Sequence, residues 1–277
     1  MDNIGEKIEI INRIVKRLEV YLNGLQDNEW SVPSQCDLWE VGDVVSHLAG
    51  GAKRQSDSMV KGRQGIAEAP QSFSNPDAST MSTGNARRDI EQRKNLGNNL
   101  FSAYVDNHTE LYELLKSFSE EEWDTPCWHA RRGAIPAKDY VDLRLQELVI
   151  HDWDIRASIG SDVNLDEEGS LALLSVAQTW LSMTFRPGSE VPRNLCFRFL
   201  VDQQPTYSHD VISNGSTFKI TPVSSTEPQI TINCDRHSYL LLVYGRILAS
   251  NKQIVSQMNT QGDDSVLQYF EEWFKGL

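Results

Sequence analysis

Four polar residues recur at helical spacing near the middle of the chain: Arg144, Glu147, His151 and Asp154. At about 3.6 residues per turn, this spacing places all four along one stripe of an α-helix. Glu147 and His151 are four residues apart, so a carboxylate and an imidazole could reach the same metal ion. A solvent-facing ladder of ion pairs would show the same spacing. Apolar residues flank the stripe, however, which favours a buried helix whose polar stripe faces the interior.

A further candidate ligand, His47, lies much earlier in the chain among aliphatic residues. Alone, a histidine in such a setting would usually be a hydrogen-bonded core residue. Together with Glu147 and His151 it completes a set of two histidines and one carboxylate. Three protein ligands leave one coordination position open, as in catalytic zinc sites. Facing helices of a bundle are a known place for such a set.

Several segments with helical periodicity could position these residues. Apolar residues from Ile4 to Leu25 alternate at spacings of four and three, which predicts one helix face. Pro136 and Gly160 are natural start and stop signals for another helix. We expect helices at about residues 4–25, 40–59, 86–118 and 136–159. Residues 62–84 show no periodicity and are expected to form a long loop, either a lid or a plain connection.

The acidic run after Gly160 is typical of a linker, and a further helix is expected at 170–183. The composition then changes, with a strand expected at Leu195–Val201 and a hairpin around Asn214-Gly215. Another strand is expected at 229–234, and helices at 238–247 and 265–274. The sequence therefore predicts an α + (α+β) chain, with a four-helix bundle in residues 1–165 and a small α+β domain with an antiparallel sheet in residues 166–277.

The composition excludes some partners. The net charge of −13 argues against nucleic acid, which requires clustered basic residues. The sequence contains no stretch of roughly 18 apolar residues that could span a membrane. The N-terminus lacks a signal-peptide pattern. The four cysteines are scattered, as expected for reduced thiols. We therefore expect a cytoplasmic protein, a monomer or weak dimer, with small molecules as partners and no membrane or nucleic acid.

The candidate ligands lie within two longer motifs. The first runs from Trp30 through Trp39 and His47 to Gly50, and the second from Arg144 to Gly160. Both resemble motifs of the mycothiol-dependent maleylpyruvate isomerase family, within the DinB-like superfamily. The C-terminal part of the chain more loosely resembles the sterol-carrier-like domain of that family, in Tyr244-Gly245-Arg246, Gly262-Asp263 and Trp273-Phe274. The resemblance therefore spans nearly the whole chain.

The resemblance implies a DinB-like metal-binding bundle with zinc, or another divalent metal, on His47, Glu147 and His151. It also implies a low-molecular-weight, mycothiol-like thiol as cosubstrate. A metal-activated thiolate could add to a double bond of a small electrophile and leave again, which is isomerisation, or displace a leaving group, which is S-transfer. We expect Asp154 to orient a ligand, and Arg144 to do the same or to pair with Glu147.

Two other classes of function remain open at this point. A non-catalytic protein could bind a small molecule or lipid in its C-terminal domain and use the metal only structurally, which a fourth ligand such as Cys36 or His129 would favour. A metal-dependent hydrolase would place water in the open position and needs only the same three ligands.

Arg246 is a candidate outside the bundle. It follows Gly245 within the almost wholly apolar run Tyr239–Ile247, where an unpaired guanidinium would be costly to bury. Two interpretations remain open. Arg246 could form an ion pair with an acidic residue such as Asp263, or it could reach a groove between the domains and bind a substrate carboxylate with its planar fork.

Overall fold

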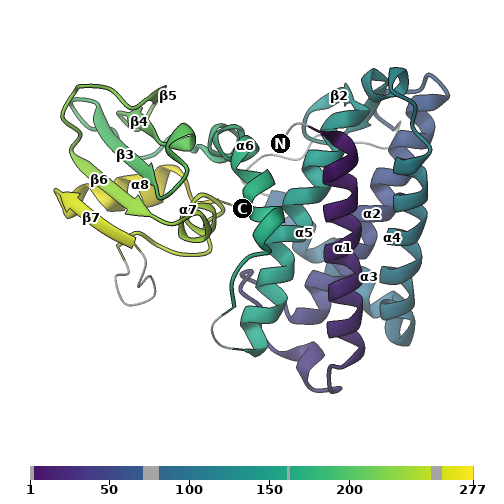
Figure 1. The fold of residues 1–277 in the computed structure, drawn as a ribbon. Helices are drawn as coiled ribbons and strands as arrows, with labels where there is room; N and C mark the ends of the chain where they lie inside the picture. The colour runs from purple at the N-terminus through teal and green to yellow at the C-terminus, as the bar shows by residue number, and fades with distance from the viewer. Residues whose placement is uncertain (1–2, 71–80, 161–162, 251–257, 277) are drawn as a thin grey trace. The chain divides into compact units, whose positions relative to one another are not determined.

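The computed structural model describes residues 3–70, 81–160, 163–250 and 258–276 (Figure 1). The chain divides into two compact units, residues 1–169 and 170–277. The division falls within a helix, slightly beyond the boundary expected from the sequence. Within the described ranges, no helix combines the length and apolarity that crossing a membrane would require.

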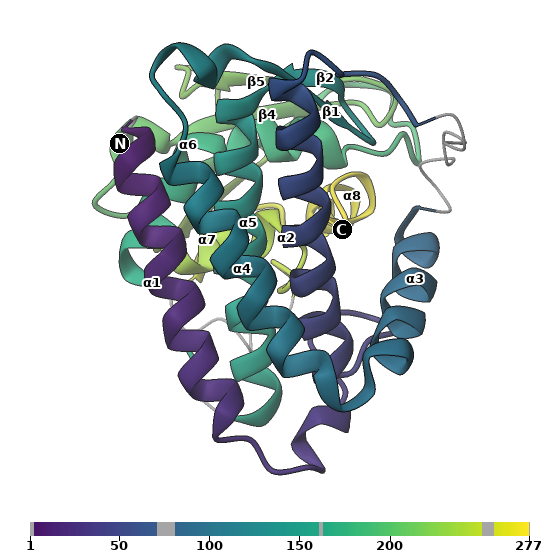
Figure 2. The same ribbon diagram turned by 90° about the vertical axis from the view of Figure 1, so that its right-hand side faces the viewer.

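Four helices of the first unit pack around one apolar core (Figure 2). Helix α1 contacts α4 and α5, and α2 contacts the same two helices. The face predicted for the first helix is the buried one, since Ile11, Leu18 and Leu22 are almost inaccessible. The four helices are α1 (Ile4–Asn23), α2 (Val41–Arg63), α4 (Leu100–Lys116) and α5 (Ala137–Ile159).

The prediction of a single helix at residues 86–118 is wrong. This segment forms two helices, α3 (Met81–Leu96) and α4, separated by the 3-10 turn Gly97–Asn99. Gly97 has φ +51, a backbone conformation that residues other than glycine rarely adopt. The break allows α3 to leave the bundle and pack against α2 (Figure 2). The loop expected at 62–84 is shorter at both ends, because α2 reaches Arg63 and α3 begins at Met81; residues 71–80 of it lie outside the described residues.

A short antiparallel hairpin, β1 (Pro126–His129) and β2 (Gly133–Pro136), precedes α5. This hairpin was not predicted from the sequence, because strands of four residues show too little alternation of apolar and polar residues. The start and end expected for α5 are confirmed: Pro136 is its N-cap residue and Gly160 its C-cap residue.

The second unit begins within α6 (Glu167–Thr184) and contains a five-stranded sheet in the order β5-β4-β3-β6-β7. The expected strands and the hairpin at Asn214-Gly215 are confirmed. Three of the four strand pairs are antiparallel, but β3 and β6 are parallel, because the chain returns from β5 to the far side of β3. The strands are β3 (Leu195–Val201), β4 (His209–Ser213), β5 (Phe218–Pro222), β6 (Ile230–Cys234) and β7 (Met258–Gly262).

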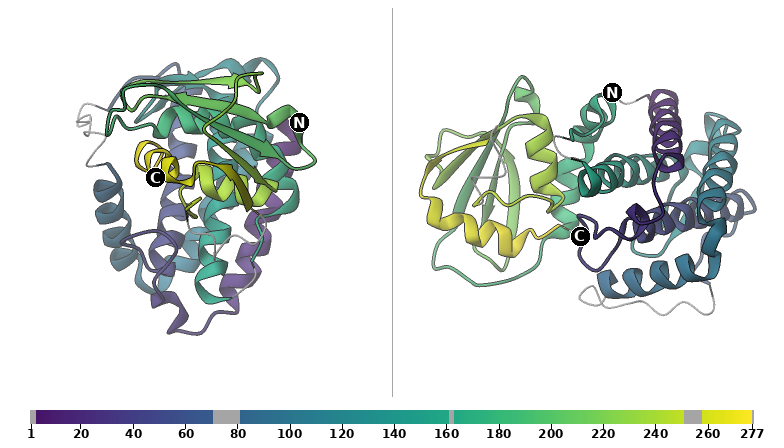
Figure 3. Two further views of the ribbon diagram at one scale, coloured as in Figure 1. Left: turned by 90° about the vertical axis from the view of Figure 1, so that its left-hand side faces the viewer. Right: turned by 90° about the horizontal axis from the view of Figure 1, so that it is seen from below.

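Two C-terminal helices cover one face of this sheet (Figure 3), and the core of the second unit lies between them and the sheet. Phe197 and Phe199 are two residues apart on β3, so their side chains share a face. Both rings contact Phe270 on α8 (Leu267–Trp273), and Phe199 also contacts Tyr239 on α7 (Arg236–Val243). Helix α7 ends at Val243, earlier than the helix expected at 238–247, so Arg246 follows the helix rather than lying within it.

Candidate metal centre

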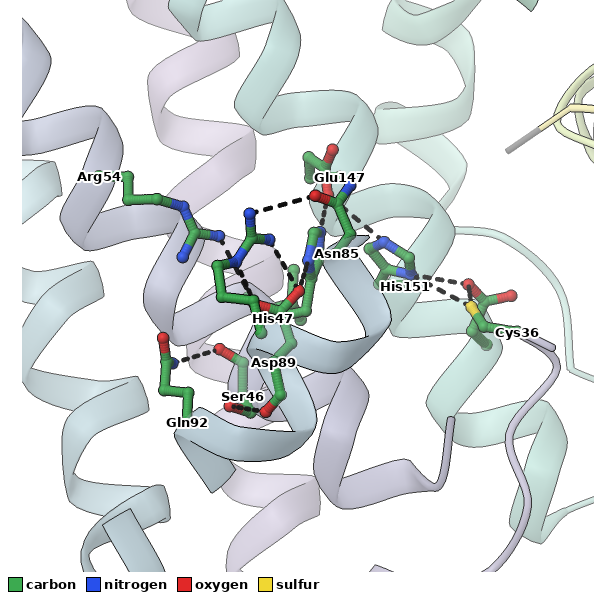
Figure 4. Close-up of polar contacts among 12 residues, drawn as sticks. Cys36, Ser46, His47, Arg54, Asn85, Asp89, Gln92, Glu147 and His151 are labelled. Carbon is green, nitrogen blue, oxygen red and sulfur yellow. Dashed lines mark hydrogen bonds and ion pairs between the residues drawn. The ribbon is translucent and has the colours of Figure 1, made fainter. Parts of the chain in front are cut away.

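Helices α2 and α5 bring His47, Glu147 and His151 together (Figure 4). The Nε2 atom of His47 lies 2.7 Å from Oε2 of Glu147, and the Nε2 atom of His151 lies 3.3 Å from the same oxygen. One potential ligand atom from each residue lies within 4.8 Å of the other two. Two imidazole nitrogens and a carboxylate oxygen thus converge on one point.

Local sequence explains how α2 presents His47. The helix begins after Glu40, whose backbone N–H donates to the carboxylate of Asp43 at 2.9 Å, so the first turn is stabilised although no serine or threonine stands at the cap. Contact between α2 and α5 then sets His47 opposite Glu147. The spacing of four residues in α5 keeps His151 on the same face as Glu147, as the sequence indicated.

A carboxylate lies behind each histidine. The Nδ1 atom of His47 is 2.8 Å from Oδ2 of Asp89 on α3, and the Nδ1 atom of His151 is 2.8 Å from Oδ2 of Asp154 on α5. Both carboxylates are fully buried. A carboxylate that accepts a hydrogen bond from Nδ1–H keeps the proton on Nδ1 and leaves the Nε2 lone pair available, which is the arrangement around many metal-bound histidines. The two Nε2 atoms that face Glu147 are therefore the ones suited to bind a metal.

The charges of these residues depend strongly on one another. Burial alone would raise the pKa of Glu147, but His47 and His151 hold it well below its ordinary value. Burial would lower the pKa of His151, yet its contacts with Asp154, Cys36 and Glu147 raise it well above the usual range. Asp89 keeps a pKa of about 2 despite burial, because His47 and Arg88 stabilise its carboxylate. The site thus maintains ionised carboxylates in the protein interior.

Trp39 is part of the same cluster. Its ring centroid lies 4.9 Å from that of His47 and 6.0 Å from that of His151. Its indole Nε1 is buried without a hydrogen-bond partner among the described residues. An unsatisfied buried donor beside two histidines is a feature expected where a bound group completes the site.

The other two predicted site residues, Arg144 and Arg246, form hydrogen bonds with backbone carbonyls. Arg144 is buried on α5, and its Nη1 atom donates to the carbonyl of Leu48 at 3.1 Å and lies 3.4 Å from Nε2 of His108. Burial lowers the pKa of Arg144, while the charge of Glu147 raises it. In the second unit, Arg246 donates from Nη1 to the carbonyl of Tyr244 at 2.9 Å. The carboxylate suggested as its partner, Asp263, accepts from the backbone N–H and the hydroxyl of Ser265.

Neither of the suggested fourth ligands joins the cluster around His47 in the part of the chain that the structure describes. The Sγ atom of Cys36 lies 3.1 Å from Oδ2 of Asp154 and 3.8 Å from Nδ1 of His151, on the side of the ring that faces away from Glu147. The Nδ1 atom of His129 accepts from the backbone N–H of Arg131 at 3.3 Å, and burial lowers the pKa of His129 to about 4. The donor set therefore stays at two histidines and one carboxylate.

The sequence pattern did not indicate Asp89, which contacts His47, or the two arginines near Asp89, Arg88 and Arg54. Figure 4 shows Asp89 and Arg54 beside His47. Arg88 and Asp89 fell in a segment expected to be one continuous helix, and nothing in its apolar pattern indicated that the first part leaves the bundle. The only available signal was Gly97 followed by two asparagines, a combination that favours a helix end.

The fold and the cluster define a two-unit protein whose helical unit carries a candidate metal-binding set on facing helices. Residues 11–156 match the family model described as mycothiol maleylpyruvate isomerase N-terminal domain. The match covers more than half of the chain, and the protein belongs to this family.

Solved structures agree with this assignment. The chain is similar to the crystal structure of the mycothiol-dependent maleylpyruvate isomerase, with a TM-score of 0.64 and 16% identity over 94% of this chain and 93% of that one. A histidine-to-alanine mutant of that isomerase gives a TM-score of 0.64 and 15% identity over the same shares. At these identities the likeness shows a common fold. No curated protein sequence matches the chain.

Proposed function

We propose that the protein is a metal-dependent enzyme that uses a low-molecular-weight, mycothiol-like thiol to isomerise or S-conjugate a small electrophilic substrate. The observation that carries the proposal is the convergence of two Nε2 atoms on the Glu147 carboxylate, with a buried carboxylate behind each histidine. Membership of the isomerase family supports the thiol and the reaction class.

The residues present fit a divalent metal, with zinc the best match. His47, Glu147 and His151 supply the nitrogen and oxygen donors of a catalytic zinc site and leave a position for an exogenous ligand. When bound there, the metal would lower the pKa of a coordinating thiol and so supply a thiolate at neutral pH. The unsatisfied indole N–H of Trp39 fits a site that a bound group completes.

The surrounding residues would hold the donors in place. Asp89 and Asp154 fix the Nδ1 protons of the two histidines, which keeps both Nε2 lone pairs directed at one point. Arg144 is buried on the same helix as Glu147, and the charge of Glu147 stabilises its guanidinium electrostatically. We assign Arg144 and Asp154 to positioning, because their hydrogen bonds run to protein groups behind the site.

For the whole chain, we propose the DinB-like type of four-helix bundle for residues 1–165 and a sterol-carrier-like type of α+β domain for residues 166–277. For Arg246 we propose the second of its two interpretations, the binding of a substrate carboxylate. Replacement by lysine tests this role: a higher Michaelis constant with an unchanged melting temperature supports it. A lower melting temperature with unaltered kinetics excludes it. The reason is that loss of a bidentate contact to a ligand weakens substrate binding, whereas loss of a structural ion pair lowers stability.

Calorimetry with a panel of cellular thiols tests the proposed function. Zinc-loaded protein should bind one class of low-molecular-weight thiol and release a proton as the sulfur coordinates, while metal-free protein should bind it far more weakly. Equal binding to the metal-free and zinc-loaded forms, or no thiol binding at all, would contradict the proposal. A desthiol analogue, in which hydrogen replaces the sulfhydryl group, separates coordination from contacts to the rest of the thiol.

A further inference from the structure

Three arginines from three different helices surround the candidate metal centre: Arg54 on α2, Arg88 on α3 and Arg144 on α5. Two of them are firmly engaged with protein groups. Arg88 donates from Nε and Nη2 to both carboxylate oxygens of Asp89, at 2.8 and 2.9 Å. Arg144 is buried and donates to the carbonyl of Leu48.

Arg54 differs from the other two. The carboxylate nearest to it among the described residues is that of Asp89, at 3.9 Å, which is beyond hydrogen-bond distance. Asp89 already accepts two hydrogen bonds from Arg88 and contacts Nδ1 of His47. Burial, together with the positive charges of Arg88 and Arg144, lowers the pKa of Arg54 to about 10. The guanidinium is thus poorly compensated, although its side chain stays 42% exposed and accessible to a small molecule.

The backbone of α2 makes room for Arg54. A Cβ atom on Gly50 would lie 2.7 Å from Nη1 of Arg54 and 2.5 Å from Oε1 of Gln92. Glycine inside a helix costs about 1 kcal/mol relative to alanine. Here it lets the arginine fold back along its own helix towards the cluster, and Figure 4 shows the guanidinium directed at the Asp89 side of His47.

Charge balance also points to an anionic ligand. The cations Arg54, Arg88 and Arg144 match the carboxylates Asp89, Glu147 and Asp154 one for one. A divalent metal would add two positive charges, and a coordinated thiolate would cancel only one of them. A further anion beside the metal would restore neutrality in a site of low dielectric constant.

We propose that Arg54 is the anion-receiving group of this centre and binds a carboxylate of the electrophilic substrate beside the metal. The inference rests on the proposed function and adds to it the residue that selects acidic substrates. A planar guanidinium can hold a carboxylate through two parallel N–H···O bonds, which orients the electrophile as well as attracting it. Because Arg54 lies in the same unit as the metal ligands, this role is independent of Arg246.

The experiment uses zinc-loaded full-length protein and maleate, a small unreactive dicarboxylate, with the dissociation constant measured by calorimetry at fixed ionic strength. Arg54→Gln removes the charge, and Arg54→Lys keeps it but loses the fork. Arg87→Gln is the matched control, because Arg87 is exposed on α3 and its replacement changes the net charge by the same amount. Zinc content and melting temperature are measured for each variant.

We expect Arg54→Gln to weaken maleate binding about tenfold or more, Arg54→Lys to be intermediate, and Arg87→Gln to stay within about twofold of the unchanged protein. Zinc content should be unaltered in all three variants. Full-strength maleate binding by Arg54→Gln, or absence of maleate binding by the unchanged zinc-loaded protein, overturns the role of Arg54 alone. Failure of the unchanged protein to take up zinc or to bind a thiol overturns the proposed function and this inference with it.

Discussion

The carboxylate of Asp89 lies 2.8 Å from Nδ1 of His47, on the opposite side of the imidazole from Glu147. Asp154 stands in the same relation to His151. Each histidine therefore lies between its own buried aspartate and the carboxylate of Glu147, which both histidines contact. Such pairing fixes the ring tautomer and raises the basicity of the nitrogen that would bind a metal.

Asp89→Asn should lower zinc affinity by roughly 10- to 100-fold, because an amide oxygen still accepts from Nδ1 but no longer supports the imidazole with a full negative charge. Competition against a chromophoric chelator measures the change. Glu91→Gln is the control, since Glu91 is an exposed acid on the same helix. Unchanged zinc affinity in Asp89→Asn would remove Asp89 from the site.

Asp166 is expected to give the first unit an acid-sensitive contact. Arg13 binds both of its carboxylate oxygens, at 2.7 and 2.9 Å, Arg17 binds one at 2.6 Å, and the N–H of Gly169 donates at 2.8 Å. Despite burial, these groups lower the pKa of Asp166 from 3.8 to about 2. Because the folded-state pKa is depressed, the stabilisation is fully present above about pH 4 and is lost as the pH falls towards 2.

Asp166→Asn should therefore reduce the free energy of unfolding by about 2 kcal/mol between pH 5 and 7, with the difference shrinking below pH 4. Denaturant titrations at several pH values measure it. Asp106→Asn, at an exposed position on α4, should have little effect. A difference between Asp166→Asn and the unchanged protein that is the same at pH 3 and pH 7 would show that the ion pairs are not its source.

Gly62 near the end of α2 is expected to resist substitution. A Cβ atom there would lie 2.5 Å from Sγ of Cys127 and 2.7 Å from the backbone carbonyl of Pro126, so α2 and β1 would have to separate. Gly62→Ala should destabilise the protein by about 1–3 kcal/mol, even though alanine is the better helix former.

Gly84 in α3 provides the control, because a Cβ atom there meets nothing within 4 Å. Gly84→Ala should leave stability unchanged or raise it by up to about 1 kcal/mol. Thermal unfolding compares the two variants. Equal stabilisation by both substitutions would show that the contact between α2 and β1 is loose.

Much of the fold follows from local signals that tertiary packing did not override. Pro136 and Gly160 bound α5 as expected, and Asn214-Gly215 marks the turn between β4 and β5. The strand β7, Met258–Gly262, was not predicted, since its sequence Met-Asn-Thr-Gln-Gly is polar and its pairing with β6 is what makes it a strand.

The three candidate ligands could be chosen from the sequence because Glu147 and His151 are neighbours on one helix, and only His47 had to come from elsewhere. Asp89 and Arg54 could not be placed in the same way. Asp89 reaches His47 only because the chain breaks at Gly97 and α3 packs against α2. Arg54 bends back over Gly50, a path that no spacing rule encodes.

Elemental analysis of the purified protein, with His47→Ala and His151→Ala beside it, tests most directly whether these residues form a metal centre. We expect about one zinc ion per chain in the unchanged protein, because two histidines and one carboxylate are sufficient protein ligands. Each variant should lose most of its metal while keeping its helical content. Full metal content in both variants would contradict the account.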